Sequence, residues 1–257
     1  METATQIDLD FYHFTLQWAD TSLILGHRLS EWCGHGPILE QDIAMANIAL
    51  DFIGEARSLY QYAAEQEGAG RTEDDLAFFR DDLEYRNCLL VEQTNGDFGK
   101  TILRQFFYEA FHVPWLEEMT KHPDAVFSGV AAKSLKEAQY HYQWSAEWVI
   151  RLGDGTEESK RRMEDAILDL WPFAGELMIP AAHELALIAA GRLPAYDAVR
   201  ARWESSIQNV FSEATLDVPA MDAWMQTGGK EGRHTESLGY LLAEMQVVQR
   251  AHPGNKW

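Results

Sequence analysis

The sequence is poor in cysteine, in basic residues and in long apolar runs. Its 257 residues include two cysteines, Cys33 and Cys88, and 41 acidic residues against 21 basic ones. A formal charge of -20 repels phosphate backbones and anionic lipid, which argues against nucleic-acid and membrane partners. No apolar run reaches the ~18 residues that cross a bilayer, and METATQIDLDFYH lacks the features of a secretion signal. We expect a soluble, cytoplasmic, reduced protein.

Strand signals are also nearly absent, because alternating β-branched runs are few and no Asn-Gly hairpin lies between such runs. Apolar residues instead recur at helical spacing, and glycine and proline interrupt them. Long helices are predicted over residues 9–32, 40–67, 101–120 and 130–152, with a shorter piece at 73–91 and further helices at 157–171, 176–190, 195–212 and 235–251. Pro114 should kink the third long helix. The pattern predicts one all-α domain, 1–257, in which an elaborated four-helix bundle (about 8–153) precedes extra C-terminal helices (about 156–257).

A bundle of four long helices can hold a di-iron carboxylate centre, built from one Glu on each of two helices and Glu-x-x-His on each of the other two. Residues three apart share a helix face, so a carboxylate and an imidazole can reach the same metal pair. The candidate ligands are Asp20, Asp51, Glu109, His112, Glu137 and His141.

Two helices depart from this motif. Gly54 stands three residues after Asp51, and Tyr140 stands three residues after Glu137, so that His141 follows at a spacing of four. Loss of even one histidine costs such a site much of its metal affinity. We interpret the six positions as vestigial and expect no metal, no cofactor and no catalytic residue in this chain. The acids also fit a buried polar network, whose candidate partners are Arg57, Arg104, Lys136 and His27.

Two further clusters of metal-ligand residue types are interpreted as structural. Glu31-Trp-Cys-Gly-His35 brings a thiol and an imidazole to a helix end, but no CxxC accompanies it. Glu231-Gly-Arg-His234 lies in the glycine-rich run TGGKEGRH, where residues three apart do not share a face. A packed helix end and a loop that anchors the last helix are predicted. Phosphate-loop, dinucleotide and nucleophile-elbow motifs are absent from the sequence.

Five sequence blocks, in order from near residue 16 to the end, are diagnostic of one family. They are RLSEWCGHGPILEQDIAMANIALDFIGEAR, NCLLVEQTNGDFGKTILRQFF, KSLKEAQYH, TGGKEGRHTESLGYLLAEMQ and PGNKW. In these blocks the chain resembles the C subunits of multicomponent ring 1,2-phenylacetyl-CoA epoxidases of aerobic phenylacetate breakdown. Only the first dozen residues and Gly175 to Leu193 are non-diagnostic.

The resemblance implies a degenerate ferritin-like fold beside a catalytic subunit of the same fold, which carries the di-iron centre. The family's enzyme adds one oxygen atom to the aromatic ring of phenylacetyl-CoA, with NADPH electrons from a reductase subunit that holds flavin and iron–sulfur groups. A further small subunit helps the assembly. We therefore expect a non-catalytic structural subunit that pairs with the catalytic subunit through a large helical face, with a homodimer as a further state of the isolated chain. Nine tryptophans and twelve phenylalanines favour such an interface.

Two other functions stay open. An active di-iron oxygenase or oxidase would use the same six ligand positions in an unusual arrangement, and Gly54 is the feature against it. A ligand-binding module would hold the coenzyme A thioester without chemistry, through the ring of Tyr85 and the guanidinium of Arg86. We expect substrate contacts only at the subunit edge, at Glu84, Tyr85, Arg86, Asn87, Leu185, Ala186 and Leu187.

Overall fold

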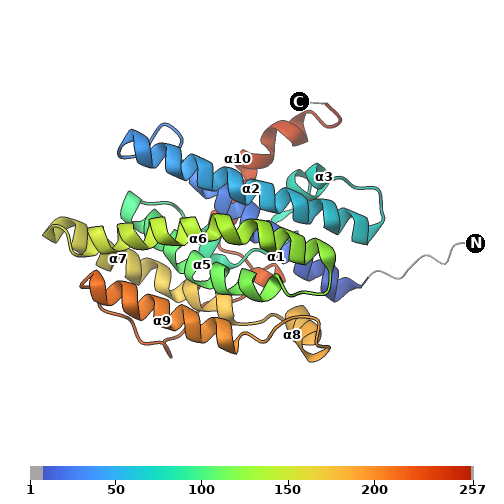
Figure 1. Cartoon of the computed structure of the whole chain (residues 1–257). Helices are drawn as coiled ribbons and strands as arrows, with labels where there is room; N and C mark the ends of the chain where they lie inside the picture. Colours follow the sequence, from blue (N-terminus) through green and yellow to red (C-terminus); the bar gives the residue numbers. More distant parts are fainter. Residues whose placement is uncertain (1–7, 256–257) are drawn as a thin grey trace, which may run out of the picture.

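The computed structural model describes residues 8–255, so the first seven residues and the last two residues of the PGNKW block lie outside it. The part of the chain that it describes is helical and contains no strand, which confirms the predicted all-α, ferritin-like fold (Figure 1). Within residues 8–255, no helix is both long and apolar enough to span a bilayer. The helices are α1 (Leu9–Ser30), α2 (Leu39–Glu67), α3 (Glu73–Phe78), η1 (Asp82–Glu84), α4 (Leu89–Glu92), α5 (Phe98–Met119), α6 (Ala125–Gly153), α7 (Glu157–Ala174), η2 (Gly175–Met178), α8 (Ala182–Ala189), α9 (Asp197–Glu213), η3 (Gly229–Glu231) and α10 (Glu236–Ala251).

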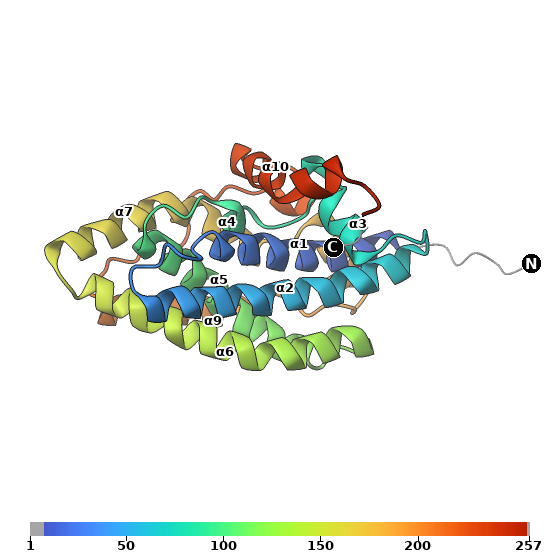
Figure 2. The same ribbon diagram turned by 90° about the horizontal axis from the view of Figure 1, so that it is seen from above.

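The four long helices form two hairpins. A short connection joins α1 to α2, another joins α5 to α6, and the two helices of each hairpin pack along each other. Residues 68–97 cross from the first hairpin to the second and carry α3, η1 and α4. Figures 1 and 2 show α2 and α6 side by side, with α1 and α5 behind them. Two short loops and one long crossover are the connectivity of ferritin-like bundles.

The C-terminal helices cover two different sides of this bundle. Helices α7 and α9 pack on α5 and α6, and α8 packs on α1. The chain then returns across the molecule, so that α10 packs on α3, η1 and α4 (Figure 2). Buried apolar residues from α1 to α10 belong to one hydrophobic cluster, which begins at Phe11 and ends at Met245.

Local capping explains why several helices begin where they do. The carboxylates of Asp8, Asp97 and Asp124 accept hydrogen bonds from backbone N–H groups in the first turns of α1, α5 and α6. Such caps satisfy donors that have no partner inside the helix. Helix α5 includes Pro114 and continues for five residues beyond it, to Met119.

Two predicted helices are broken in the structure. Ile179 is extended, because Pro180 disfavours a helical residue before it, and this separates η2 from α8. The piece predicted over 73–91 is split into α3, η1 and α4. Its first break follows from Arg80, whose Nε donates to Leu76 O at 2.6 Å while the guanidinium turns inward to Asp20.

Most aromatic side chains pack in the hydrophobic core. Of the phenylalanines and tryptophans in the described residues, only Phe79 and Trp224 are among the exposed large hydrophobic side chains. The high aromatic content is therefore explained by packing inside the chain. It gives no independent support for an interface.

Candidate functional site

Four of the predicted ligand positions meet at the centre of the bundle. On α5, Glu109 and His112 lie on one face, and His141 reaches them from α6. The Nδ1 atom of His141 is 3.1 Å from Oε1 of Glu109, and its Nε2 atom is 3.0 Å from Oδ2 of Asp51 on α2. The Nδ1 atom of His112 is 3.4 Å from Oε2 of Glu109.

The fifth member of this cluster is Glu55, which is not among the predicted ligand positions. Its Oε1 accepts hydrogen bonds from Trp18 Nε1 at 2.9 Å and Ser22 Oγ at 2.6 Å, and lies 3.6 Å from Nε2 of His112. The spacing of Ile48, Phe52, Glu55 and Leu59 places Glu55 on the buried face of α2. That periodicity is the signal that could have identified it.

The charges of the cluster support one another. Burial favours the neutral form of Glu55, but the positive charge and close approach of His112, together with hydrogen bonds from Ser134 and Ser22, outweigh burial and lower the pKa of Glu55 to about 2. Burial likewise disfavours the charged form of His112, yet Glu55 and Glu109 raise its pKa to about 10. Hydrogen bonds to Asp51 and Glu109 raise the pKa of His141 to about 9 against the effect of burial. Both imidazoles are therefore cationic at neutral pH.

These residues do not fit a di-iron centre. The cavity between Glu55, His112 and His141 has a volume of about 10 Å³, which is space for roughly one water molecule. Among residues 8–255, no group of three or more His, Cys, Asp or Glu side chains is arranged to hold a metal ion.

The remaining two predicted ligand positions lie differently. Asp20 belongs to a separate buried cluster, in which it accepts hydrogen bonds from Tyr60, from the guanidinium of Arg80 and from the backbone N–H of Arg86. Glu137 lines the 10 Å³ cavity, half-buried, and Lys133 lies 4.0 Å from it. Burial and the charge of Asp51 raise the pKa of Glu137.

The predicted buried network of acids is present, but its predicted partners are wrong. Arg57 pairs with Glu73 at the surface. Arg104 is buried and donates to Gln93 O and Asn95 Oδ1, not to a carboxylate. The cations that neutralise the central acids are His112, His141 and Arg80.

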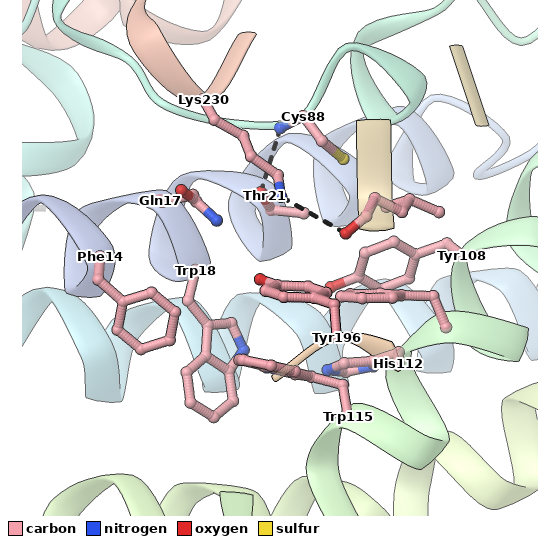
Figure 3. A pocket seen from close by; sticks show the side chains of 12 residues that line it. Phe14, Gln17, Trp18, Thr21, Cys88, Tyr108, His112, Trp115, Tyr196 and Lys230 are labelled. Carbon is pink, nitrogen blue, oxygen red and sulfur yellow. Dashed lines mark hydrogen bonds between the residues drawn. The ribbon is translucent and has the colours of Figure 1, made fainter. Parts of the chain in front are cut away.

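A second cavity, of about 40 Å³, adjoins His112 on the side facing α1. Figure 3 shows aromatic rings, among them Trp18, Trp115 and Tyr196, along one side, and Lys230 and Cys88 along the other. Neither ring nitrogen of His112 has a hydrogen-bond partner within the described structure. The cavity has room for two or three water molecules, roughly, and polar lining to bind them.

The predicted substrate segment is partly buried. The ring of Tyr85 is inaccessible, with its hydroxyl donating to Ala77 O and the Arg80 guanidinium 4.4 Å from its centroid. Asn87 is also buried and donates to Oε2 of Glu92 at 2.9 Å. Glu84 is exposed, and Arg86 is half-buried. The side chains of Tyr85 and Asn87 are thus already engaged inside the chain.

On α8, Leu185 and Ala186 are exposed, whereas Leu187 is buried in the core. The positive charge of Arg86 contributes to lowering the pKa of His183 on α8, after the larger effect of burial. The accessible side chains of the predicted edge are Glu84, Arg86, Leu185 and Ala186.

The run TGGKEGRH is a loop that anchors the start of α10, as predicted. Glu176 accepts hydrogen bonds from the backbone N–H groups of Gly228 and Gly229 at 2.7 and 2.9 Å. A Cβ atom on Gly229 would lie 2.4 Å from Asn87 O, so the loop requires glycine there. His234 lies 2.7 Å from Oε2 of Glu92 through its Nδ1 atom.

The other cluster, Glu31 to His35, is an exposed turn after α1. The Nδ1 atom of His35 lies 3.2 Å from Cys33 O, and both side chains are exposed. No third ligand type joins them in the described residues.

The chain is similar to known proteins along nearly all of its length. The family model described as "Phenylacetic acid catabolic protein" matches residues 2–257. A curated relative from Escherichia coli (strain K12), the C component of its 1,2-phenylacetyl-CoA epoxidase, is 46% identical over 244 residues, which are 95% of this chain and 98% of the relative.

Proposed function

Because the chain belongs to the phenylacetic acid catabolic protein family, we propose that it is a non-catalytic, structural subunit of a multicomponent 1,2-phenylacetyl-CoA epoxidase, as the name of its relative suggests. In this proposal the chain supports a catalytic subunit of the same fold, which carries the di-iron centre. The complex also includes a small accessory subunit and a reductase subunit with NADPH, flavin and iron–sulfur groups. Phenylacetyl-CoA touches this chain only at its edge.

The observation that carries the proposal is the position of His112. Its ring lies between the buried carboxylates of Glu55 and Glu109, at 3.6 and 3.4 Å. A cationic imidazole there supplies the positive charge that a metal pair would supply to the carboxylates of a ferritin-like oxygenase. The bundle keeps the acids and neutralises them with its own side chains, which supports a structural rather than a catalytic role for this chain.

The interface with the catalytic subunit is assigned to the exposed apolar face of α2. Leu39, Ile43 and Leu50 are 71%, 52% and 65% exposed and are spaced four and seven residues apart, which places them along one side of the helix. Exposed apolar side chains along one side of a helix on an acidic chain favour a protein partner over solvent. The same face accounts for a homodimer of the isolated chain.

Metal analysis tests the non-catalytic role. The chain purified alone after growth in iron-rich medium should contain far less than one iron per chain, whereas the complex with the catalytic subunit should contain iron and epoxidise phenylacetyl-CoA. Close to two irons per isolated chain, or epoxidase activity with the reductase and without the catalytic subunit, would show that this chain is itself the oxygenase.

A matched pair of leucine variants tests the interface. Leu50→Arg should reduce co-purification with the catalytic subunit at least tenfold, because it buries an unpaired charge in an apolar contact. Leu168→Arg is the control, since Leu168 on α7 is 74% exposed and lies away from this face. Equal co-purification of both variants would show that the interface lies elsewhere on the chain. The outcome of the metal analysis would not be affected.

A further inference from the structure

A cavity of about 240 Å³ lies outside the four-helix bundle. It is lined by the end of α7, by η2, by α9 and by the segment before η3 that includes Met221 and Met225. Its volume is six times that of the cavity beside His112 (240 against 40 Å³), and none of the residues that line it belongs to the central cluster.

The floor of this cavity is aromatic and apolar. The rings of Trp171 and Trp203 lie 5.7 Å apart between their centroids and are tilted by 32°. Their indole N–H groups are already used, by Ala220 O at 3.4 Å and Phe107 O at 2.9 Å. The cavity therefore meets ring carbons, and Met178, with the two loop methionines, adds flexible apolar surface.

Two opposite charges line the same cavity without pairing. Arg200 and Glu204 are one turn apart on α9, a spacing at which Arg and Glu side chains can interact. Arg200 is exposed, and its guanidinium donates to Met178 O at 3.0 Å and forms no ion pair within residues 8–255. Glu204 is half-buried and makes no hydrogen bond or ion pair within residues 8–255.

We propose that this cavity binds an apolar α-amino acid in its zwitterionic form. The carboxylate of the ligand pairs with Arg200, its ammonium group pairs with Glu204, and its side chain lies against the two indoles and the methionines. A cavity of about 150 Å³ in another protein binds benzene, so 240 Å³ accommodates a side chain with one ring. A simple anion or a simple amine would leave one of the two charges unpaired. The inference does not depend on the proposed role in an epoxidase.

Calorimetric titration of the full chain with three related ligands tests this proposal. L-Phenylalanine carries both charges, 3-phenylpropionate lacks the ammonium group, and phenethylamine lacks the carboxylate. We expect L-phenylalanine to bind at least about tenfold more tightly than either analogue, since each of them loses a charge-assisted contact.

Variants of α9 assign the two contacts. Arg200→Gln should weaken L-phenylalanine at least about tenfold and leave phenethylamine unchanged, and Glu204→Gln should weaken L-phenylalanine and leave 3-phenylpropionate unchanged. Arg202→Gln is the control, because Arg202 is on the same helix but pairs with Glu117. Circular dichroism establishes that each variant is folded. No binding of any ligand at millimolar concentration, or equal binding of all three by the wild-type chain, would overturn the proposal.

Discussion

Replacing His112 by glutamine tests whether a protonated imidazole neutralises the centre of the bundle. Glutamine keeps hydrogen-bonding groups of similar size but removes the positive charge between Glu55 and Glu109. Raising a histidine pKa from 6.5 to about 10 corresponds to about 5 kcal/mol of differential stabilisation. Removing one partner of a buried ion pair costs about 3–5 kcal/mol. Because whole domains are stable by only about 5–15 kcal/mol, His112→Gln should lose roughly a fifth or more of the stability.

Urea unfolding at pH 7, followed by circular dichroism, measures this loss. The double variant Glu55→Gln/His112→Gln removes both charges, so it should be less destabilised than the sum of the two single variants by about 2 kcal/mol. His35→Gln is the control, because His35 is exposed, and its effect should stay within about 0.5 kcal/mol.

The pH dependence has a definite sign. The folded state raises the pKa of His112, so the stabilisation is complete below 6.5 and is lost as the pH rises to about 10. The folded state lowers the pKa of Glu55 from 4.5 to about 2, so its contribution is lost as the pH falls through that range. The stability gap between wild type and His112→Gln should thus be widest near pH 6 and narrow towards pH 10. A gap that is absent at pH 6, or that widens with rising pH, would refute the charged imidazole.

Two further predictions concern the edge and the anchoring loop. In the assembled complex, Arg86→Ala should weaken phenylacetyl-CoA binding by roughly 1–3 kcal/mol and leave the iron content unchanged. Equilibrium titration measures this affinity, with Arg57→Ala as the control. An unchanged affinity would mean that this chain has only a structural role. Gly229→Ala should destabilise the chain by roughly 1–3 kcal/mol in urea unfolding, because its Cβ would meet Asn87 O. Gly239→Ala on α10, where a Cβ has open space, should instead stabilise the chain by about 0.5–1 kcal/mol. Equal effects of the two substitutions would contradict the close approach of Gly229 to Asn87.

The helices could be predicted because their causes are local. Apolar spacing, Asp caps and glycine stops lie within a few residues of each helix, and even the break before α8 is encoded by Pro180. The break after α3 has a distant cause, the pairing of Arg80 with Asp20, sixty residues earlier. No local pattern carries that information.

The candidate site was predicted in part for the same reason. Glu109 and His112 share one face of one helix, so their spacing in the sequence is enough to predict that they meet. His141 stands four residues after Glu137, which is close enough to the motif spacing of three to identify it as a candidate. Whether Asp51 or Glu55 lies at the centre depends on which face of α2 is buried. The apolar periodicity of α2 indicates the buried face, but the ligand motif does not. Asp20 fits the motif by residue type, but Tyr60 and Arg80 hold it in another cluster.

The anchoring loop has a consequence for how the chain is synthesised. Buried carboxylates at residues 92, 176 and 184 receive donors from residues 228–235, the last segment before α10. A ribosome adds about 5–20 residues per second, so for several seconds the emerging bundle holds acids whose donors have not yet been made. A chain that stops before residue 228 leaves those acids buried without these partners, a state that costs several kcal/mol. Truncated products should therefore fail to fold and be degraded, so that they do not compete with complete chains for partner subunits.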